Sequence, residues 1–276
     1  MQRSSLSVLA GFLSLAVLGL AGCKQDQPVP GAETGDFSLL MDNGVSATSA
    51  GVRTFTKLVL GSGNYKNPNG DDFTVTTFKY YISNVTLRKA DNSTYAVPNS
   101  YFLVDEAAPA SQVLKMTGVP AGSYTGLTFT VGVDSARTKA GSFTGVLNAS
   151  NGMFWDMNGP EFINLKLEGR SPQAPTSALV FHLAGYKGAA NNTIRTVTLP
   201  FGSTPLPVRA GHVPEAHLQV DIAKLFTGPN PTVANPPFLN PVNFATVYNK
   251  IGGPAVAKLA DNVAAGMFSV MHVSVN

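Results

Sequence analysis

The chain has 276 residues, of which only 13% are charged, and its formal net charge is +3. With 27 glycines and 19 prolines, turns are frequent, which favours many short strands over a helical bundle. The small net charge and the absence of a Lys/Arg cluster argue against a nucleic-acid-binding protein. Cys23 is the single cysteine, so no intrachain disulfide can form.

The N-terminal stretch has the pattern of an export and anchoring segment. Arg3 precedes an apolar run at residues 6–20, which is too short to span a bilayer comfortably. Small residues then lead into Cys23, and this resembles the cleavage site of bacterial lipoproteins. The resemblance implies a signal peptide at residues 1–22 and an acylated Cys23; an ordinary signal peptide with a coincidental cysteine is the alternative.

Residues 23–35 are polar and contain prolines, which is typical of a tether. We therefore expect a domain at residues 36–276 that works in the cell envelope. The expected anchor is lipid in the outer membrane, with the domain facing the periplasm or the cell surface.

Alternation of apolar and polar residues predicts strands along most of this domain. It is clearest at residues 161–169, where Ile163, Leu165 and Leu167 face away from their polar neighbours. Further strands are expected at residues 37–41, 54–60, 73–87, 101–105, 122–134, 179–183, 194–199, 216–225 and 267–275.

One helix is expected at residues 255–265, because Pro254 fits its start and Gly266 its end. No internal repeat or boundary divides the domain. The sequence thus predicts an all-β protein, a single β-sandwich of roughly 8–10 strands with one short helix near the C-terminus.

Trp155 is the single tryptophan, and it lies between Met153 and Met157 in a segment that turn-forming residues close at both ends. A lone tryptophan most often fills the core, here as a plug at the end of the sandwich. The flanking thioethers offer a second interpretation, in which the segment belongs to a soft-metal or redox site.

The sequence has four histidines, His182, His212, His217 and His272. A histidine in a strand is more often exposed or hydrogen-bonded than a ligand. His182 and His272 nevertheless each interrupt a strongly apolar run, so each needs a polar partner if it is buried. Imidazole with thioether suits copper, and the thioether favours Cu(I).

Signatures of common enzymes are absent from the sequence: it has no Gly-x-Ser-x-Gly elbow, zinc-protease helix, phosphate loop or dinucleotide fingerprint. Asp134, Asp156 and Glu161 could serve a hydrolase, but no spacing rule supports them. The segment at residues 67–71 partly resembles a calcium loop and lacks the downstream glutamate, so a plain turn is preferred.

Several stretches together resemble the MbnP-like domain of bacterial envelope lipoproteins. They lie at residues 78–87, 101–105, 132–134, 152–155, 162–169, 181–183, 221–226, 260–262 and 267–273. The resemblance implies a β-sandwich, copper binding, and a partner similar to di-haem cytochrome c peroxidases. In that family the partner can oxidise a tryptophan to kynurenine, which helps to hold copper. Trp155 occupies the matching position, whereas Met157 replaces a second aromatic found in many relatives.

We therefore predict a copper-binding envelope lipoprotein without turnover of its own. The expected ligands are His182, His272, Met157 and Trp155, the last as kynurenine, converging at one end of the sandwich. The alternative is a non-catalytic scaffold that binds a glycan or a protein without metal, with Tyr80 and Tyr81 as a stacking surface.

Overall fold

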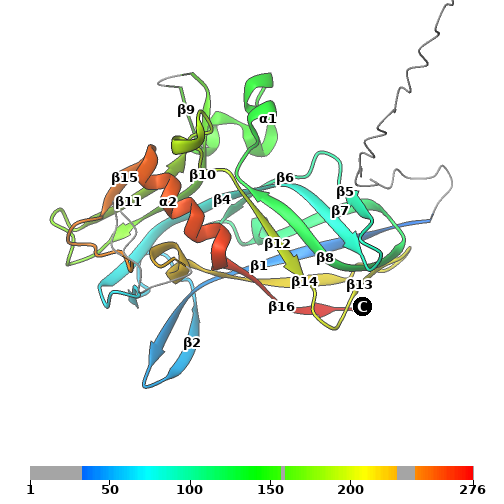
Figure 1. The fold of residues 1–276 in the computed structure, drawn as a ribbon, viewed down its shortest axis with the longest axis horizontal. Coiled ribbons are helices and arrows are strands. Elements are labelled where there is room, and N and C mark those ends of the chain that lie inside the picture. The colour runs from blue at the N-terminus through cyan, green and yellow to red at the C-terminus, as the bar shows by residue number, and fades with distance from the viewer. Residues whose placement is uncertain (1–32, 157–158, 229–239, 276) are drawn as a thin grey trace, which may run out of the picture.

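The computed structural model describes residues 33–156, 159–228 and 240–275, and these form two β-sheets packed face to face (Figure 1). The smaller sheet has five strands in the order β16-β14-β1-β2, with β7 also paired to β1. Its strands are β1 (Thr34–Ser49), β2 (Val52–Lys57), β7 (Val113–Pro120), β14 (Glu215–Asp221) and β16 (Phe268–Ser274).

The larger sheet has eleven strands, ordered β12-β8-β4-β10-β11-β15 along its main path. The strands on that path are β4 (Asp72–Lys89), β8 (Gly122–Val131), β10 (Glu161–Arg170), β11 (Ala178–Ala184), β12 (Arg195–Pro200) and β15 (Asn249–Ile251). The strands paired beside it are β3 (Tyr65–Lys66), β5 (Thr94–Ala96), β6 (Tyr101–Asp105), β9 (Phe154–Trp155) and β13 (Leu206–Val208). The predicted all-β sandwich is confirmed, but the described residues form sixteen strands and not the 8–10 expected, because several short strands pair beside the main path.

The main core lies between the two sheets. Phe268 of the smaller sheet meets two rings of the larger one, with centroids 5.8 Å from Tyr80 and 5.2 Å from Phe129, both edge-on. At one end of the core Phe73, Phe226 and Phe244 pack against one another with centroids 4.9–5.8 Å apart. Such edge-to-face contacts add to the free energy gained by burial alone.

The predicted C-terminal helix is α2 (Pro254–Asn262), which continues into a π-turn at Val263–Met267. Gly253, with φ 84°, turns the chain into it, and Val256 and Leu259 lie on its buried face. A second, short helix, α1 (Ser135–Ala140), precedes the Trp155 segment. Neither of these described helices has the length and apolar character needed to cross a membrane.

One predicted strand is shorter than expected. The pattern at residues 216–225 predicts a strand throughout, but β14 ends at Asp221 and a 3-10 turn, Ile222–Phe226, follows. The Asp221 carboxylate accepts a hydrogen bond from the backbone N–H of Ala223, which caps this turn. Every residue of the turn except Lys224 is buried. The apolar residues that predict a strand here therefore pack in the core, but in a 3-10 turn.

A polar network crosses the sandwich beside the core. Tyr80 Oη donates to Asn43 Oδ1 at 2.9 Å, and Asn43 Nδ2 donates to Glu106 Oε2 at 2.8 Å. Gln112 Nε2 donates to the same carboxylate oxygen at 3.0 Å. Burial raises the pKa of Glu106 above its ordinary value, although the hydrogen bond from Asn43 opposes the shift.

Phe226→Ala should lower the free energy of unfolding by about 3–5 kcal/mol, because it leaves a cavity among Phe73, Phe181 and Phe244. Chemical denaturation of the full chain measures the change. Val52→Ala, at an exposed hairpin end, is the control and should cost about 0.5 kcal/mol or less. Equal losses in the two variants would contradict this packing.

Glu106→Gln should change the pH dependence of stability, because Gln keeps an oxygen for Asn43 and Gln112 and removes the charge. The folded-state pKa of Glu106 is raised, so its contribution is full below the unfolded pKa of about 4.3 and is lost as pH rises through the folded pKa. The free energy of unfolding of the wild type, relative to the variant, should therefore fall as the pH rises from about 4 to 7. A difference that stays constant over this range would contradict the assignment.

Candidate functional site

Trp155 lies at the end of the larger sheet rather than within the main core. Strand β9 runs antiparallel to the start of β10, with Trp155 opposite Glu161 and Phe154 opposite Phe162. Gly152, at φ 71° in the left-handed region, ends the 3-10 turn before it. The indole is half-buried, so one part of it packs and another part is open to solvent.

A small second core supports the indole. It consists of Tyr81, Val133, Leu147, Met153, Phe162, Ile163 and Ala184, with Phe143, Phe154 and Trp155 packed against it. Met153 is fully buried there, and this assigns its side chain to packing. Met157, one of the predicted ligands, lies outside the described residues.

The open side of the indole borders a cavity of about 520 Å³. Trp155 Nε1–H donates to Glu161 Oε2 at 3.0 Å, and the other carboxylate oxygen lies 3.5 Å from Lys187 Nζ. The backbone of Gly252 lies close to the ring, since a Cβ there would be 3.7 Å from it. The indole N–H of Trp155 is thus held by a carboxylate that an ammonium also contacts.

His182 lies in the middle of β11 with its side chain on the outer face of the larger sheet, because Phe181 and Leu183 on either side fill the core. Its Nε2 is 2.8 Å from Glu168 Oε1. Burial lowers the pKa of His182, and although Glu168 opposes this shift the pKa stays below its ordinary value. His182 is therefore a neutral imidazole at neutral pH.

Two hydrogen bonds tie the surroundings of His182 to the Trp155 segment. Gly252 N–H, beside the indole, donates to the carbonyl of His182 at 3.2 Å. Lys166, the cross-strand neighbour of His182, donates to the carbonyl of Gly152 at 2.6 Å. The backbone of His182 is therefore linked to the Trp155 segment, whereas its imidazole contacts Glu168 and is not among the residues that line the cavity beside Trp155.

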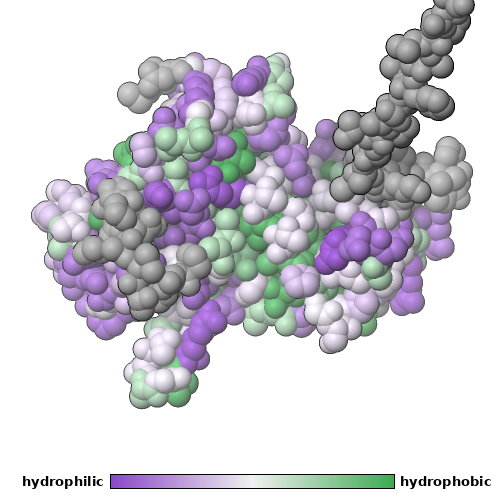
Figure 2. All heavy atoms as spheres, viewed as in Figure 1, coloured by the Kyte–Doolittle hydropathy of each residue, from purple (hydrophilic) through white to green (hydrophobic). Residues whose placement is uncertain are grey.

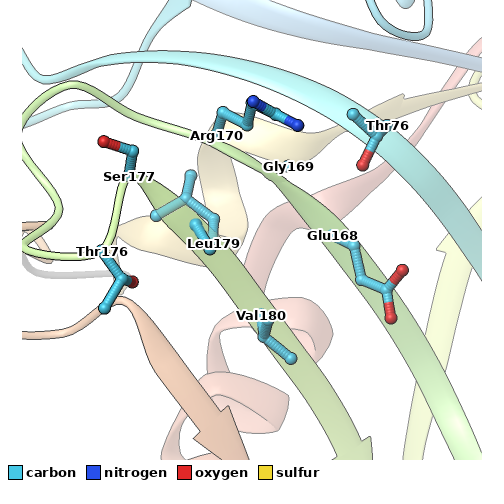
Figure 3. A pocket seen from close by; sticks show the side chains of 9 residues that line it. Thr76, Glu168, Gly169, Arg170, Thr176, Ser177, Leu179 and Val180 are labelled. Atoms are coloured by element: carbon cyan, nitrogen blue, oxygen red, sulfur yellow. The ribbon is translucent and has the colours of Figure 1, made fainter.

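Glu168 also borders a second cavity of about 520 Å³ on this outer face. Figure 3 shows Glu168 and Arg170 leaving β10, with Thr76 on the neighbouring β4 and Val180 on β11. Glu168 thus contacts His182 through its carboxylate and also lines this cavity, whose other walls are both polar and apolar. Burial raises the pKa of Glu168, but hydrogen bonding by His182 together with the nearby Lys166 charge keeps it below its ordinary value, so Glu168 is ionised.

His272 differs from the expectation in two ways. It belongs to β16 in the smaller sheet, so the structure does not bring it together with His182 in the larger one. The apolar run around His272 is not buried at this point, because β16 is an edge strand and both Met271 and His272 are exposed, so burial does not force His272 to have a polar partner. Its aromatic neighbour is His217, with ring centroids 4.4 Å apart.

Tyr80, Tyr81 and Asp134, three residues of the rival hypotheses, have structural roles. Tyr80 and Tyr81 are 0% and 1% exposed, so they form no stacking surface. Asp134 caps α1 by accepting the N–H of Arg137 at 2.9 Å. Burial raises the pKa of Asp134, but hydrogen bonds, including one from Tyr101, outweigh it and hold the pKa below its ordinary value. A general acid would need the opposite shift.

The loop at residues 67–71 is closed by its own side chains. Asn67 Oδ1 accepts the N–H groups of Asn69 and Asp71, and Asp71 Oδ2 accepts the N–H of Phe244 at 2.8 Å. These oxygens therefore hold the turn and fix it to a distant segment. Over the described part of the chain, no three His, Cys, Asp or Glu side chains gather as a metal-binding group.

Sequence reasoning missed Glu168 as a partner of His182, and it considered Glu161 only for hydrolysis. The alternation in β10 already places Lys166 and Glu168 together on the outer face. Which strand lies beside β10 is a long-range property, so the pairing with β11 could not be read from that alternation.

Comparisons with known proteins give one family. A comparison with curated proteins found no match. A solved structure, MbnP from Methylosinus trichosporium, is similar at 12% identity with a TM-score of 0.45, over 70% of this chain and 78% of that chain. The sequence profile of the MbnP family matches residues 34–244. That match covers most of both sheets, and the chain belongs to the MbnP family.

Proposed function

We propose that this protein is a copper-binding lipoprotein of the bacterial cell envelope, acting in copper acquisition or handling without turnover of its own. Membership of the MbnP family supports a role in copper handling. The observation that carries the proposal is the position of Trp155, which is half-buried at the wall of a cavity instead of being enclosed in the core.

The donors around this region suit a soft metal. His182 is neutral, and its Nε2 contacts Glu168, which leaves Nδ1 with a free lone pair in the tautomer that Glu168 favours. A carboxylate on the second nitrogen of a metal-binding histidine orients the ring and raises its basicity. The proposed ligands are His182, Trp155 after modification, and Met157.

Unmodified tryptophan is a poor ligand, because its ring nitrogen only donates a hydrogen bond. We propose that a di-haem peroxidase-like partner, with peroxide as oxidant, converts Trp155 to kynurenine. Oxidation opens the five-membered ring, and hydrolytic loss of the formyl carbon leaves an aniline nitrogen and a ketone oxygen. The indole is half-exposed and borders a cavity, so a partner protein can reach the ring.

In this proposal Glu161 holds the nitrogen of the Trp155 side chain before and after modification. It accepts the indole N–H at 3.0 Å, and it contacts Lys187 as well. The same carboxylate can accept from the aniline nitrogen after ring opening, and so keep that nitrogen at the cavity wall. Glu161 is therefore a positioning residue for the modified side chain.

The chain produced with a di-haem peroxidase and peroxide should bind a Cu(I) equivalent that Trp155→Phe does not bind. Peptide mass spectrometry should identify kynurenine at position 155 in the wild type alone. Competition with a chromophoric Cu(I) chelator should show that His182→Gln weakens this equivalent by more than ~100-fold, and Glu168→Gln by roughly 10–100-fold.

His212→Gln is the matched control and should leave this Cu(I) affinity unchanged, because His212 lies in the loop between β13 and β14, neither of which pairs with β10 or β11. Indistinguishable affinities for His182→Gln and His212→Gln would reject His182 as a ligand. Failure to find kynurenine under these conditions would reject the modification.

Cys23→Ala should release the protein into the soluble fraction of the cell envelope, since loss of the acylated thiol removes the stable anchor. Fractionation with immunodetection measures the distribution. The wild type should stay in the membrane pellet after washing with high salt. Retention of the variant in that pellet would rule out lipid anchoring at this residue.

A further inference from the structure

Two histidines that are not part of the proposed Trp155 site lie next to each other on the outer face of the smaller sheet. His217 of β14 stands opposite His272 of β16, and their ring centroids are 4.4 Å apart with planes at 40°. Imidazole–metal bonds are about 2 Å long, so one cation can reach both rings. Because His272 is exposed, its ring can turn toward such a cation at little cost.

A β-bulge adds a third donor to this pair. The register of β14 and β16 shifts by one residue after His217, so that Leu218 is opposite Val270 and Met271 is the extra residue. Val270 and Val273 pack against the main core. Met271 and His272, between them, are both exposed. The bulge therefore presents a thioether and an imidazole side by side toward solvent.

His217 is held in place by a chain of two hydrogen bonds, through Glu215 to Ser38. His217 Nε2 is 2.8 Å from Glu215 Oε1, and Ser38 Oγ donates to the other oxygen of that carboxylate at 3.0 Å. Ser38 is buried and pairs with Glu215 across β1 and β14. This is the arrangement in which a carboxylate fixes the tautomer of a metal-binding histidine and leaves Nδ1 as the donor.

From this juxtaposition we propose a second, independent Cu(I) site formed by His217, His272 and Met271, with Glu215 as a positioning residue. Two imidazoles and a thioether are a soft donor set, which favours Cu(I) over Zn²⁺. The only carboxylate named in this set, Glu215, is engaged by His217 and Ser38, so a hard cation gains little there. The site lies on the other sheet from Trp155 and needs no modified side chain.

Trp155→Phe of the full chain isolates this site, because it removes the ligand expected from modification. Titrated with Cu(I) against a chromophoric chelator, this variant should still bind one equivalent. Adding His217→Gln or His272→Gln should weaken that equivalent by more than ~100-fold, and Glu215→Gln by roughly 10–100-fold. Adding Met271→Leu should weaken it less than either histidine change, and adding His182→Gln or His212→Gln should leave it unchanged.

Imidazole NMR signals of the unsubstituted chain give a test that does not depend on how a variant folds. On addition of Cu(I), the signals of His217 and His272 should shift together before those of His212. The proposal is overturned if Trp155→Phe binds no Cu(I), if both histidine variants bind as the wild type does, or if Zn²⁺ binds as tightly as Cu(I). Loss of the equivalent with His182→Gln would also overturn it, because the metal would then belong to the Trp155 region.

Discussion

Hydrogen bonding between β4 and β10 is the constraint on which the rest of the larger sheet depends. Strand β4 also pairs with β8, β6, β5 and β3, while β10 pairs with β11 and β9. At Gly169 the paired strands β4 and β10 lie so close that a Cβ there would collide with the carbonyl oxygen of Thr74. A glycine is therefore required at this approach. Strand β10, held there against β4, pairs in turn with β11, where Lys166 is opposite His182, and with β9, where Glu161 is opposite Trp155.

Buried polar groups are accommodated by specific partners throughout. Within the described ranges no buried side-chain nitrogen or oxygen lacks a hydrogen-bond partner. Asn164 illustrates the principle: it accepts from Val133 N–H at 3.0 Å and donates to Thr193 Oγ1 at 2.8 Å, so it links β10 to two loops. Because an unpaired buried polar group costs free energy, such links specify one arrangement of the loops around the sandwich.

The two faces of the protein offer different chemistry for a soft metal. In the larger sheet, His182 is half-buried and contacts Glu168, and its carbonyl accepts the N–H of Gly252 beside the Trp155 ring. In the smaller sheet, the exposed His272 lies on the edge strand β16 opposite the half-buried His217 of β14, and Met271 precedes His272 in the chain. Elsewhere on the surface, the β1–β2 hairpin projects beyond the body of the protein. Figure 2 shows that hydrophobic and hydrophilic residues are mixed over the visible face.

The sequence by itself determined the fold class, the C-terminal helix, and the alternation of β11 and of β10 from Leu165 onward, because these follow from local periodicity. It did not show the bulge that puts Ile163 in the second core, apart from Leu165 and Leu167. The tertiary structure alone decided which strands are neighbours. It separated His272 from His182, paired His272 with His217 through a bulge, and gave His182 the carboxylate of Glu168. The physical reason is that a period of two residues assigns a side chain to a face of its sheet, but the order of strands and the position of a bulge depend on hydrogen bonds between segments far apart in the chain.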